Sequence, residues 1–98
     1  MIRSFADDAT RDVYDGINSK RARKRLDPKL FSIAHRKLDM IDASVDLVDL
    51  KIPPSNHLEV LKGDLKGMHS IRINDKYRII FRWTMQGAED VKIIDYHS

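Results

Sequence analysis

The sequence predicts an α+β fold, with N-terminal helices packed on an antiparallel β-meander in a single domain over residues 1–98. A chain of this length buries one modest core, so a second domain is not expected. Before Pro53-Pro54 the apolar residues recur at helical spacing, and after it they alternate with a period of two, which is typical of strands. Helices followed by a run of strands with short turns indicate the α+β class.

The first half of the chain contains one short candidate strand and two candidate helices. Residues 2–5 alternate between apolar and polar types, which favours a short strand. From Asp7 a helix is expected, because acidic residues are stabilised in a first helical turn. Asp27 before Pro28 begins the longer helix, since a capping acid followed by proline is typical of a helix start. This helix is expected to end near Ala43 or after one further turn, and the proline pair stops it in either case. Its apolar stripe consists of Leu30, Ile33, Ala34, Leu38 and Ile41.

The predicted meander has strands at residues 58–61, 69–73, 77–84 and 88–96. Three-residue loops at 74–76 and 85–87 keep the apolar faces in register, because side chains alternate between the two faces of a strand. This register places Arg72 opposite Arg78, with Tyr96 on the same face one diagonal step beyond Arg78. The other face carries Ile79 and Phe81 and is the predicted core face.

The composition is mildly basic and limits the possible chemistry. The net charge is +3, the pI is about 9.3 and 34% of the residues are charged, which permits an RNA partner without requiring one. The absence of cysteine excludes disulfides, a thiol nucleophile and cysteine-ligated metals. No apolar run approaches the roughly 20 residues of a membrane span, and the first residues lack signal-peptide form, so a cytoplasmic location is expected.

A basic run at residues 20–25 puts five cations in six positions. Arg23, Lys24 and Arg25 in this run are candidate contacts to RNA phosphates. The same run is equally compatible with a solvated turn between helices or with a docking site for an acidic partner.

The pairing of Arg72 with Arg78 suggests an anion site. Two like charges directly opposite on a sheet are destabilising, and a phosphate between two guanidinium groups would offset the repulsion. The alternative is that the side chains splay apart in solvent, or that Asp75 and Asp95 neutralise them.

An acid, a phenol and an imidazole stand side by side at Asp95, Tyr96 and His97, directly before the last residue, Ser98. Histidine can transfer protons near neutral pH, and tyrosine can stack on a base. A terminal histidine is also often a loose tail, and neighbours on a strand point to opposite faces. His69 is expected on the core face as a hydrogen-bonded structural residue. The four histidines, at positions 35, 57, 69 and 97, show no metal-ligand spacing, so no metal site is predicted.

Three segments carry a resemblance to a known family: LKGD at 61–64, HSIRIND at 69–75 and DYH at 95–97. Together with the stretches 56–64 and 67–79 around them, they resemble the HigB-type plasmid-maintenance killer proteins of the RelE-like ribonuclease group. The first five residues and the helix around residues 36–43 look similar too, so the resemblance covers nearly the whole chain.

The resemblance implies a compact RelE-like fold and metal-independent, cofactor-free cleavage of messenger RNA in the ribosomal decoding site. It implies attack of a ribose 2′-hydroxyl on its own 3′-phosphate. Lys62 and Arg78 would stabilise the phosphate, with Arg72 as a further RNA contact. His97 would transfer protons and Asp95 would orient it, while Tyr96 would position or stack a base.

The resemblance also implies partners: a HigA-like helix-turn-helix antitoxin, the ribosome with bound messenger RNA, and operator DNA through the antitoxin alone. One position departs from the family. Some relatives carry an active histidine three residues before the turn lysine, where this chain has Glu59. Glu59 could act as a base instead. The alternative function is a non-catalytic RNA- or ribosome-binding module, or a co-repressor bound to its antitoxin.

Overall fold

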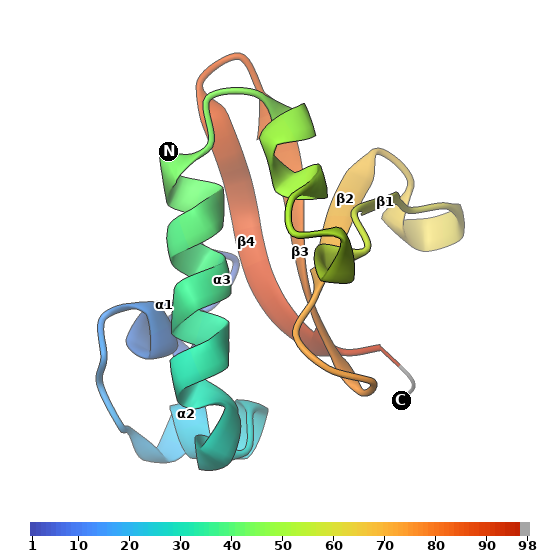
Figure 1. The fold of residues 1–98 in the computed structure, drawn as a ribbon. Coiled ribbons are helices and arrows are strands. Elements are labelled where there is room, and N and C mark those ends of the chain that lie inside the picture. Colours follow the sequence, from blue (N-terminus) through green and yellow to red (C-terminus); the bar gives the residue numbers. More distant parts are fainter. Residues whose placement is uncertain (97–98) are drawn as a thin grey trace.

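The computed structural model describes residues 1–96 and has the predicted α+β architecture. Three helices come first, followed by an antiparallel sheet in the order β1-β2-β3-β4 (Figure 1). The helices are α1 (Asp8–Tyr14), α2 (Lys20–Arg25) and α3 (Phe31–Ala43). The strands are β1 (Glu59–Val60), β2 (Met68–Arg72), β3 (Tyr77–Thr84) and β4 (Gly87–Asp95). Short 3-10 turns join them: η1 (Pro28–Leu30), η2 (Leu47–Lys51), η3 (Pro54–Asn56) and η4 (Gly63–Leu65).

The two helix starts that the sequence predicted, at Asp7 and at Asp27, are both capped by these side chains. The Asp7 carboxylate accepts a hydrogen bond from the Thr10 N–H at 2.8 Å and starts α1. Asp27 caps η1, which leads directly into α3. The basic run was also open to interpretation as a turn between helices, and that interpretation is wrong. Ser19 caps these residues as α2, because its hydroxyl accepts the Ala22 N–H at 3.1 Å.

The register of the sheet around the arginines is as predicted, but the last loop is not. Arg72 pairs with Arg78, and Arg78 pairs with Ile94. Thr84 pairs with Gly87, so the loop has two residues rather than the predicted three, and Gly87 belongs to β4. A bulge then restores the predicted register, since the pairing shifts by one residue between Ile80 and Arg82. Asp90, opposite this shift, takes the left-handed φ of 54° that such a bulge accommodates.

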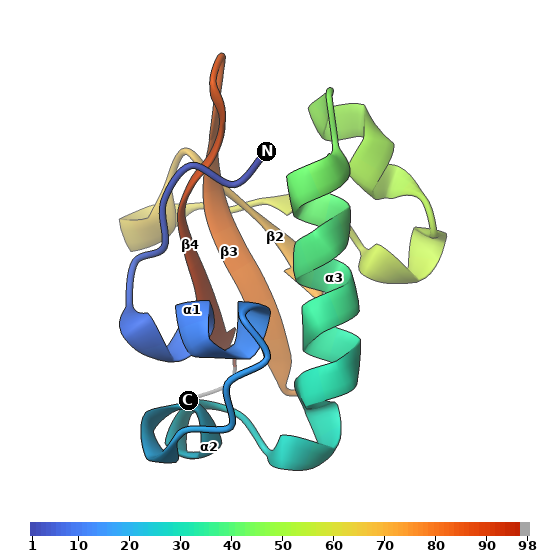
Figure 2. The same ribbon diagram turned by 90° about the vertical axis from the view of Figure 1, so that its left-hand side faces the viewer.

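The first residues lie along β4 in parallel orientation, as Figure 2 shows. The predicted strand at residues 2–5 is reduced to two isolated bridges, Ile2 to Ala88 and Phe5 to Val91. The Arg3 N–H donates to Ala88 O at 2.7 Å, and the Ala88 N–H donates to Met1 O at 2.9 Å. The bulge interrupts this pairing, which explains why a continuous strand does not form.

The helices and one face of the sheet enclose the main core. Its fully buried side chains include Leu38 and Ile41 from α3 and Ile79, Phe81 and Ile93 from the sheet. Burying each side chain of this size contributes about 1.5–3 kcal/mol. A smaller apolar cluster, formed by Leu61, Met68 and Ile80, covers part of the opposite face. Arg78 projects from that same opposite face, because it alternates with Ile79 along β3.

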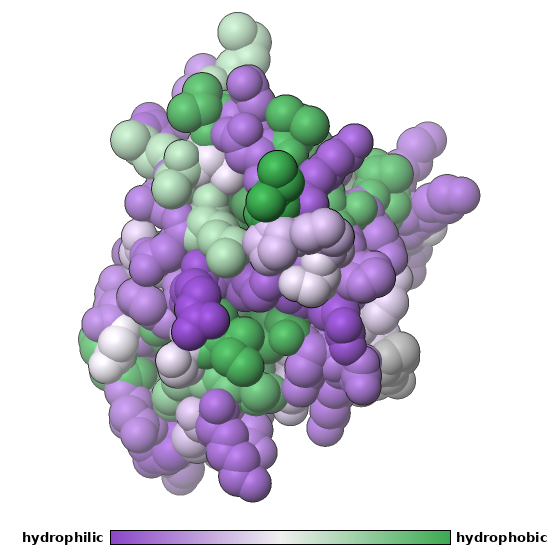
Figure 3. Space-filling model, viewed as in Figure 1, coloured by the Kyte–Doolittle hydropathy of each residue, from purple (hydrophilic) through white to green (hydrophobic). Residues whose placement is uncertain are grey.

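The surface around η2 carries isolated apolar side chains. Val45, Val48 and Ile52 are all more than half exposed. Hydrophilic residues dominate the face drawn in Figure 3, and apolar residues appear there in separate groups. Within residues 1–96, no helix combines the length and the hydropathy required to cross a bilayer.

Gly87 is the position where the first residues and β4 approach most closely, at a φ of +127°. A Cβ at this position would lie 2.2 Å from Met1 O. Gly87→Ala is therefore expected to lower the free energy of unfolding by about 2–4 kcal/mol, because backbone must move to relieve the clash. Urea unfolding followed by circular dichroism measures the change.

Gly16→Ala is the matched control, because its φ is +75° and no atom lies within 4 Å of the added Cβ. This substitution should lower the free energy of unfolding by about 1 kcal/mol, because alanine disfavours the left-handed backbone conformation at this position. Equal losses in the two variants would contradict the close contact between residues 1 and 87.

Candidate active site

The candidate site lies on the sheet face that the helices leave uncovered. Antiparallel pairing sets Arg72 opposite Arg78 and Ser70 opposite Ile80, and paired residues share a face. Ser70 is buried and Arg78 is only 7% exposed, so this part of the face is polar and largely desolvated.

Neutral oxygen atoms hold the Arg78 guanidinium. Its Nε donates to Ser70 Oγ at 2.8 Å, and its Nη2 donates to His57 O at 2.5 Å and to Ser70 O at 3.4 Å. Within residues 1–96, no carboxylate forms an ion pair with it. The site therefore contains a buried, hydrogen-bonded cation whose charge no acid among the described residues neutralises. Such a group is ready to receive an anion.

Tyr96 lies over this guanidinium, as the sheet register predicted. The Cζ of Arg78 is 5.3 Å from the centre of the Tyr96 ring, a cation–π distance. The Tyr96 N–H donates to Lys76 O at 2.8 Å, which fixes the end of β4 against the turn before β3. Tyr96 is 43% exposed as a residue, which leaves room for a base to stack on its side chain.

Asp95 forms an ion pair with Lys76 at 3.6 Å and lies opposite Tyr77 in the sheet. The pairing orients the carboxylate toward the turn before β3. His97, to which the family resemblance assigns proton transfer, lies outside the described residues.

Arg72 is neutralised by an ion pair within the protein. This weakens the hypothesis that Arg72 and Arg78 together hold an anion. Its Nη2 forms an ion pair with Asp75 Oδ1 in the turn between β2 and β3. The alternative raised for the arginine pair, neutralisation by Asp75, therefore holds for Arg72. Arg78 remains the cation without a carboxylate partner among the described residues.

Glu59 lies in β1, and Lys62 follows that strand as the residue before η4. Lys62 is exposed just before η4 and makes no ion pair with any of residues 1–96. Glu59 is paired with Ser70, and paired residues share a face, so it lies on the Arg78 face. Within β1, Glu59 is therefore the residue directly opposite Ser70, whose hydroxyl accepts the hydrogen bond from Arg78.

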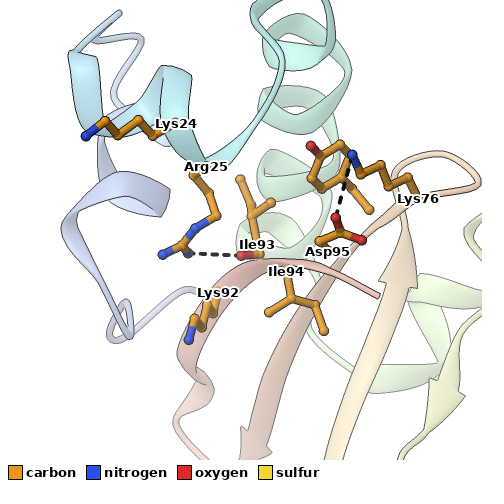
Figure 4. Close-up of a pocket in the computed structure, with 8 residues that line it drawn as sticks. Lys24, Arg25, Lys76, Lys92, Ile93, Ile94 and Asp95 are labelled. Carbon is orange, nitrogen blue, oxygen red and sulfur yellow. Dashed lines mark hydrogen bonds and ion pairs between the residues drawn. The ribbon is translucent and has the colours of Figure 1, made fainter. Parts of the chain in front are cut away.

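A cationic groove begins beside Asp95 and runs to α2. It is open, has a volume of about 650 Å³, and is shown in Figure 4. Lys24 and Arg25 line it from α2, Lys92 from β4 and Lys76 from the turn before β3. Asp95 is the acidic residue among its lining side chains. Lys76 joins groove and site, because its carbonyl holds Tyr96.

The three candidate RNA contacts on α2 have different surroundings. Arg25 forms an ion pair with Asp7 and donates to Ile93 O at 3.0 Å, so it ties α2 to α1 and β4. Arg23 is exposed and its Nη1 donates to Asn18 O at 2.7 Å. Lys24 is exposed and lines the groove.

Asp12 anchors α2 to α1 and so fixes one wall of the groove. Arg21 Nε and Ser19 Oγ each lie 2.6 Å from Asp12 Oδ2. These two hydrogen bonds hold the pKa of Asp12 below its ordinary value of 3.8.

His69 lies on the core face opposite Phe81, as predicted, with the two ring centres 6.1 Å apart. The expectation that it is hydrogen-bonded is wrong for one atom: Nδ1 is buried and has no partner among residues 1–96. Burial also lowers the pKa of the ring, which favours the neutral form. Over the same residues, no cluster of three histidine and acidic side chains could hold a metal ion.

Ser70 and the carbonyl of His57 are the site groups that sequence reasoning missed. Strand alternation already placed Ser70 on the Arg78 face, which was a usable signal. The His57 carbonyl had no such signal, because it reaches Arg78 from a loop 21 residues away in sequence.

This architecture, three helices on one face of a four-stranded antiparallel sheet with a buried arginine on the other, is that of a small RelE-like α+β domain. A family model described as the RelE-like toxin of the type II toxin–antitoxin system HigB matches residues 3–97. The chain therefore belongs to the HigB-like toxin family.

Two relatives are similar over much of the chain. Toxin HigB-1 of Vibrio cholerae serotype O1 is 50% identical over 62 residues, which cover 62% of this chain and 65% of that protein. The match thus spans slightly less than two thirds of the Vibrio toxin. An uncharacterized protein of Haemophilus influenzae is 38% identical over 74 residues, covering 76% of this chain and 72% of that protein.

Asp12→Asn is expected to lower the free energy of unfolding at neutral pH, because Arg21 and Ser19 lose their carboxylate partner. The folded pKa of Asp12 lies below 3.8, so its contribution is complete above about pH 3.8 and is lost as the pH falls through the lower folded value. The stabilities of wild type and variant should therefore converge in acid. Urea unfolding at a series of pH values measures this.

Asp8→Asn provides the comparison, since Asp8 is exposed and lies 3.5 Å from the same arginine. Its loss should be small at every pH. A loss as large and as pH-dependent as that of Asp12→Asn would argue against Asp12 as the anchor.

Proposed function

We propose that this chain is the toxin of a type II toxin–antitoxin system and cleaves messenger RNA on the ribosome. Membership of the HigB-like family supports the toxin assignment. The observation that carries the catalytic part is the Arg78 guanidinium, which is buried on neutral acceptors and stacked on Tyr96. Arg78 has no carboxylate partner among residues 1–96, and a phosphodiester would supply an anion for it, because arginine binds phosphate oxygens through parallel hydrogen bonds.

In the proposed reaction a ribose 2′-oxygen attacks the adjacent phosphorus and the bond from phosphorus to the 5′-oxygen breaks. The products are a 2′,3′-cyclic phosphate and a free 5′-hydroxyl. One group removes the 2′-hydroxyl proton and another gives a proton to the departing 5′-oxygen. Arg78 and Lys62 stabilise the charge that develops on the phosphate. The proposed reaction therefore requires neither a metal ion nor a cofactor.

His97, oriented by Asp95, is the proposed proton donor or acceptor, and Tyr96 stacks on a base of the message. Glu59 is the second proposed proton-transfer group, supported by its register opposite Ser70 on the Arg78 face. A carboxylate can take the part that a histidine plays in some relatives.

The cationic groove is proposed to hold the backbone of the same RNA strand. It joins the site at Lys76 and Asp95, and its other cations lie within reach of successive phosphates. Lys24 and Lys92 are the proposed phosphate contacts, with Arg25 fixing the wall between them; Arg23 and Arg72 are proposed to contact RNA at the margins.

The proposed setting is the cytoplasm, with a HigA-like helix-turn-helix antitoxin that silences the toxin. Operator DNA is proposed to be bound through the antitoxin alone. Family membership supports the antitoxin partner.

Expression of the chain should arrest growth, and co-expression of the antitoxin should restore it. Primer extension on translated messages should reveal discrete cuts that depend on the ribosome.

Arg78→Gln should slow single-turnover cleavage by about 10²–10³-fold, because charge stabilisation of the phosphate is lost.

Arg82→Gln is the matched control on the same strand, because Arg82 is exposed and pairs with Asp90 at 3.6 Å. It removes one positive charge outside the site and should cleave normally. Growth arrest without cuts would favour the non-catalytic binding module, and full cleavage by Arg78→Gln would reject the assigned site.

Removing the groove cations should weaken RNA binding in a salt-dependent way. Lys24→Gln combined with Lys92→Gln should reduce affinity for ribosomes carrying a 2′-O-methylated message that cannot be cut. The slope of log affinity against log salt should fall by about 0.7–0.9 per lost phosphate contact. Lys51→Gln, a cation on η2 outside the groove, should change neither quantity, and an equal effect there would show that only net charge matters.

A further inference from the structure

The loop between η3 and β1 reaches the buried arginine from outside the sheet. Its anchor is Asn56, which is fully buried. The Asn56 Nδ2 donates to Leu50 O at 3.1 Å and to Ile52 O at 3.4 Å, and its Oδ1 accepts a hydrogen bond from Lys37 Nζ. The loop is therefore fixed to η2 and to α3 immediately before His57.

His57 has an unusual backbone conformation for its residue type. Its φ is 46° and its ψ is 56°, in the left-handed region that residues other than glycine seldom adopt. Its N–H closes η3 by donating to Pro54 O at 3.0 Å. The residue is exposed, yet its carbonyl accepts the 2.5 Å hydrogen bond from Arg78 Nη2. The left-handed turn thus directs a carbonyl, rather than a side chain, at the site.

We infer that His57 is a positioning residue whose backbone carbonyl, held in place by the left-handed turn after Asn56, orients the Arg78 guanidinium toward the phosphate. The inference rests on the proposed function for what Arg78 does, but not for how Arg78 is held.

The chemistry of the acceptor explains why a carbonyl suits this task. Ser70 Oγ holds Nε and the His57 carbonyl holds Nη2, so these two hydrogen bonds, together with the covalent bond to Cδ, fix the orientation of the guanidinium. Both acceptors are neutral and leave the positive charge available. A carboxylate in either place would orient the group equally well but would cancel the charge that the phosphate needs.

Two substitutions of His57 separate the carbonyl from the imidazole. Both His57→Gly and His57→Val remove the imidazole. Glycine adopts the left-handed conformation freely, whereas a β-branched residue strongly disfavours it. If the carbonyl is the functional group, the two variants should differ, and if the imidazole is functional they should fail together.

The orientation of Arg78 can be followed directly by NMR of the ¹⁵N-labelled guanidinium group. Wild type and His57→Gly should show separate, slowly exchanging Nη2 proton signals, and His57→Val should show averaged ones. This readout does not depend on activity. If wild type shows these signals but cuts no message, the proposed function fails while the positioning role stands.

Single-turnover cleavage on the ribosome gives the second readout. His57→Val should cleave on the order of 100-fold more slowly than His57→Gly, with ribosome affinity similar in both, because a displaced catalytic group affects the chemical step. Equal rates in the two variants, fast or slow, would overturn the inference, as would identical guanidinium signals.

A double-mutant cycle guards against a general loss of folding in His57→Val. Lysine at position 78 has no Nη2 for the carbonyl to hold, so His57→Val should add little to the defect of Arg78→Lys. Additive losses would mean that His57 acts independently of Arg78 and would reject the positioning role.

Discussion

The alternation of side chains along β3 is the constraint on which both the core and the site depend. β3 pairs with β2 on one side and with β4 on the other, so its residues cannot turn without breaking both ladders. Ile79 and Phe81 therefore face the helices and are fully buried there. Arg78, between Tyr77 and Ile79, must face away. Because burial of Ile79 and Phe81 fixes the orientation of β3, it also fixes Arg78 on the opposite face of the sheet.

The arginines of this chain differ in whether a carboxylate neutralises them, and the net charge does not show this difference. Arg21, Arg25 and Arg72 each have a carboxylate partner and act as structural links. Arg78 is held by Ser70 and by a backbone carbonyl, which orient it but leave its charge in place. A net charge of +3 would not reveal this difference, because it counts paired and unpaired cations alike.

The bulge near Asp90 shows how two local features can compensate. A two-residue loop alone would shift the whole of β4 by one residue and turn Ile93 away from the core. The extra residue of the bulge restores the pairing of Ile79 with Ile93. The predicted three-residue loop gave the correct register beyond the bulge for this reason, although the loop itself was wrong.

The sequence by itself determined the α+β class, the Asp7 cap of α1, the Asp27 cap of the turn that leads into α3, and the face shared by Arg72, Arg78 and Tyr96. These follow from periodicity and alternation, which are local properties of a chain. Only the tertiary structure decided which cations are neutralised, that residues 20–25 form a helix against Asp12, and that the His57 carbonyl reaches Arg78. The Arg72–Asp75 pair is local and was among the sequence alternatives, but contacts such as Arg25 with Asp7 and Arg78 with His57 O join residues 18 and 21 positions apart. A backbone oxygen also leaves no mark on residue type, so no pattern along the chain could have specified the last of these.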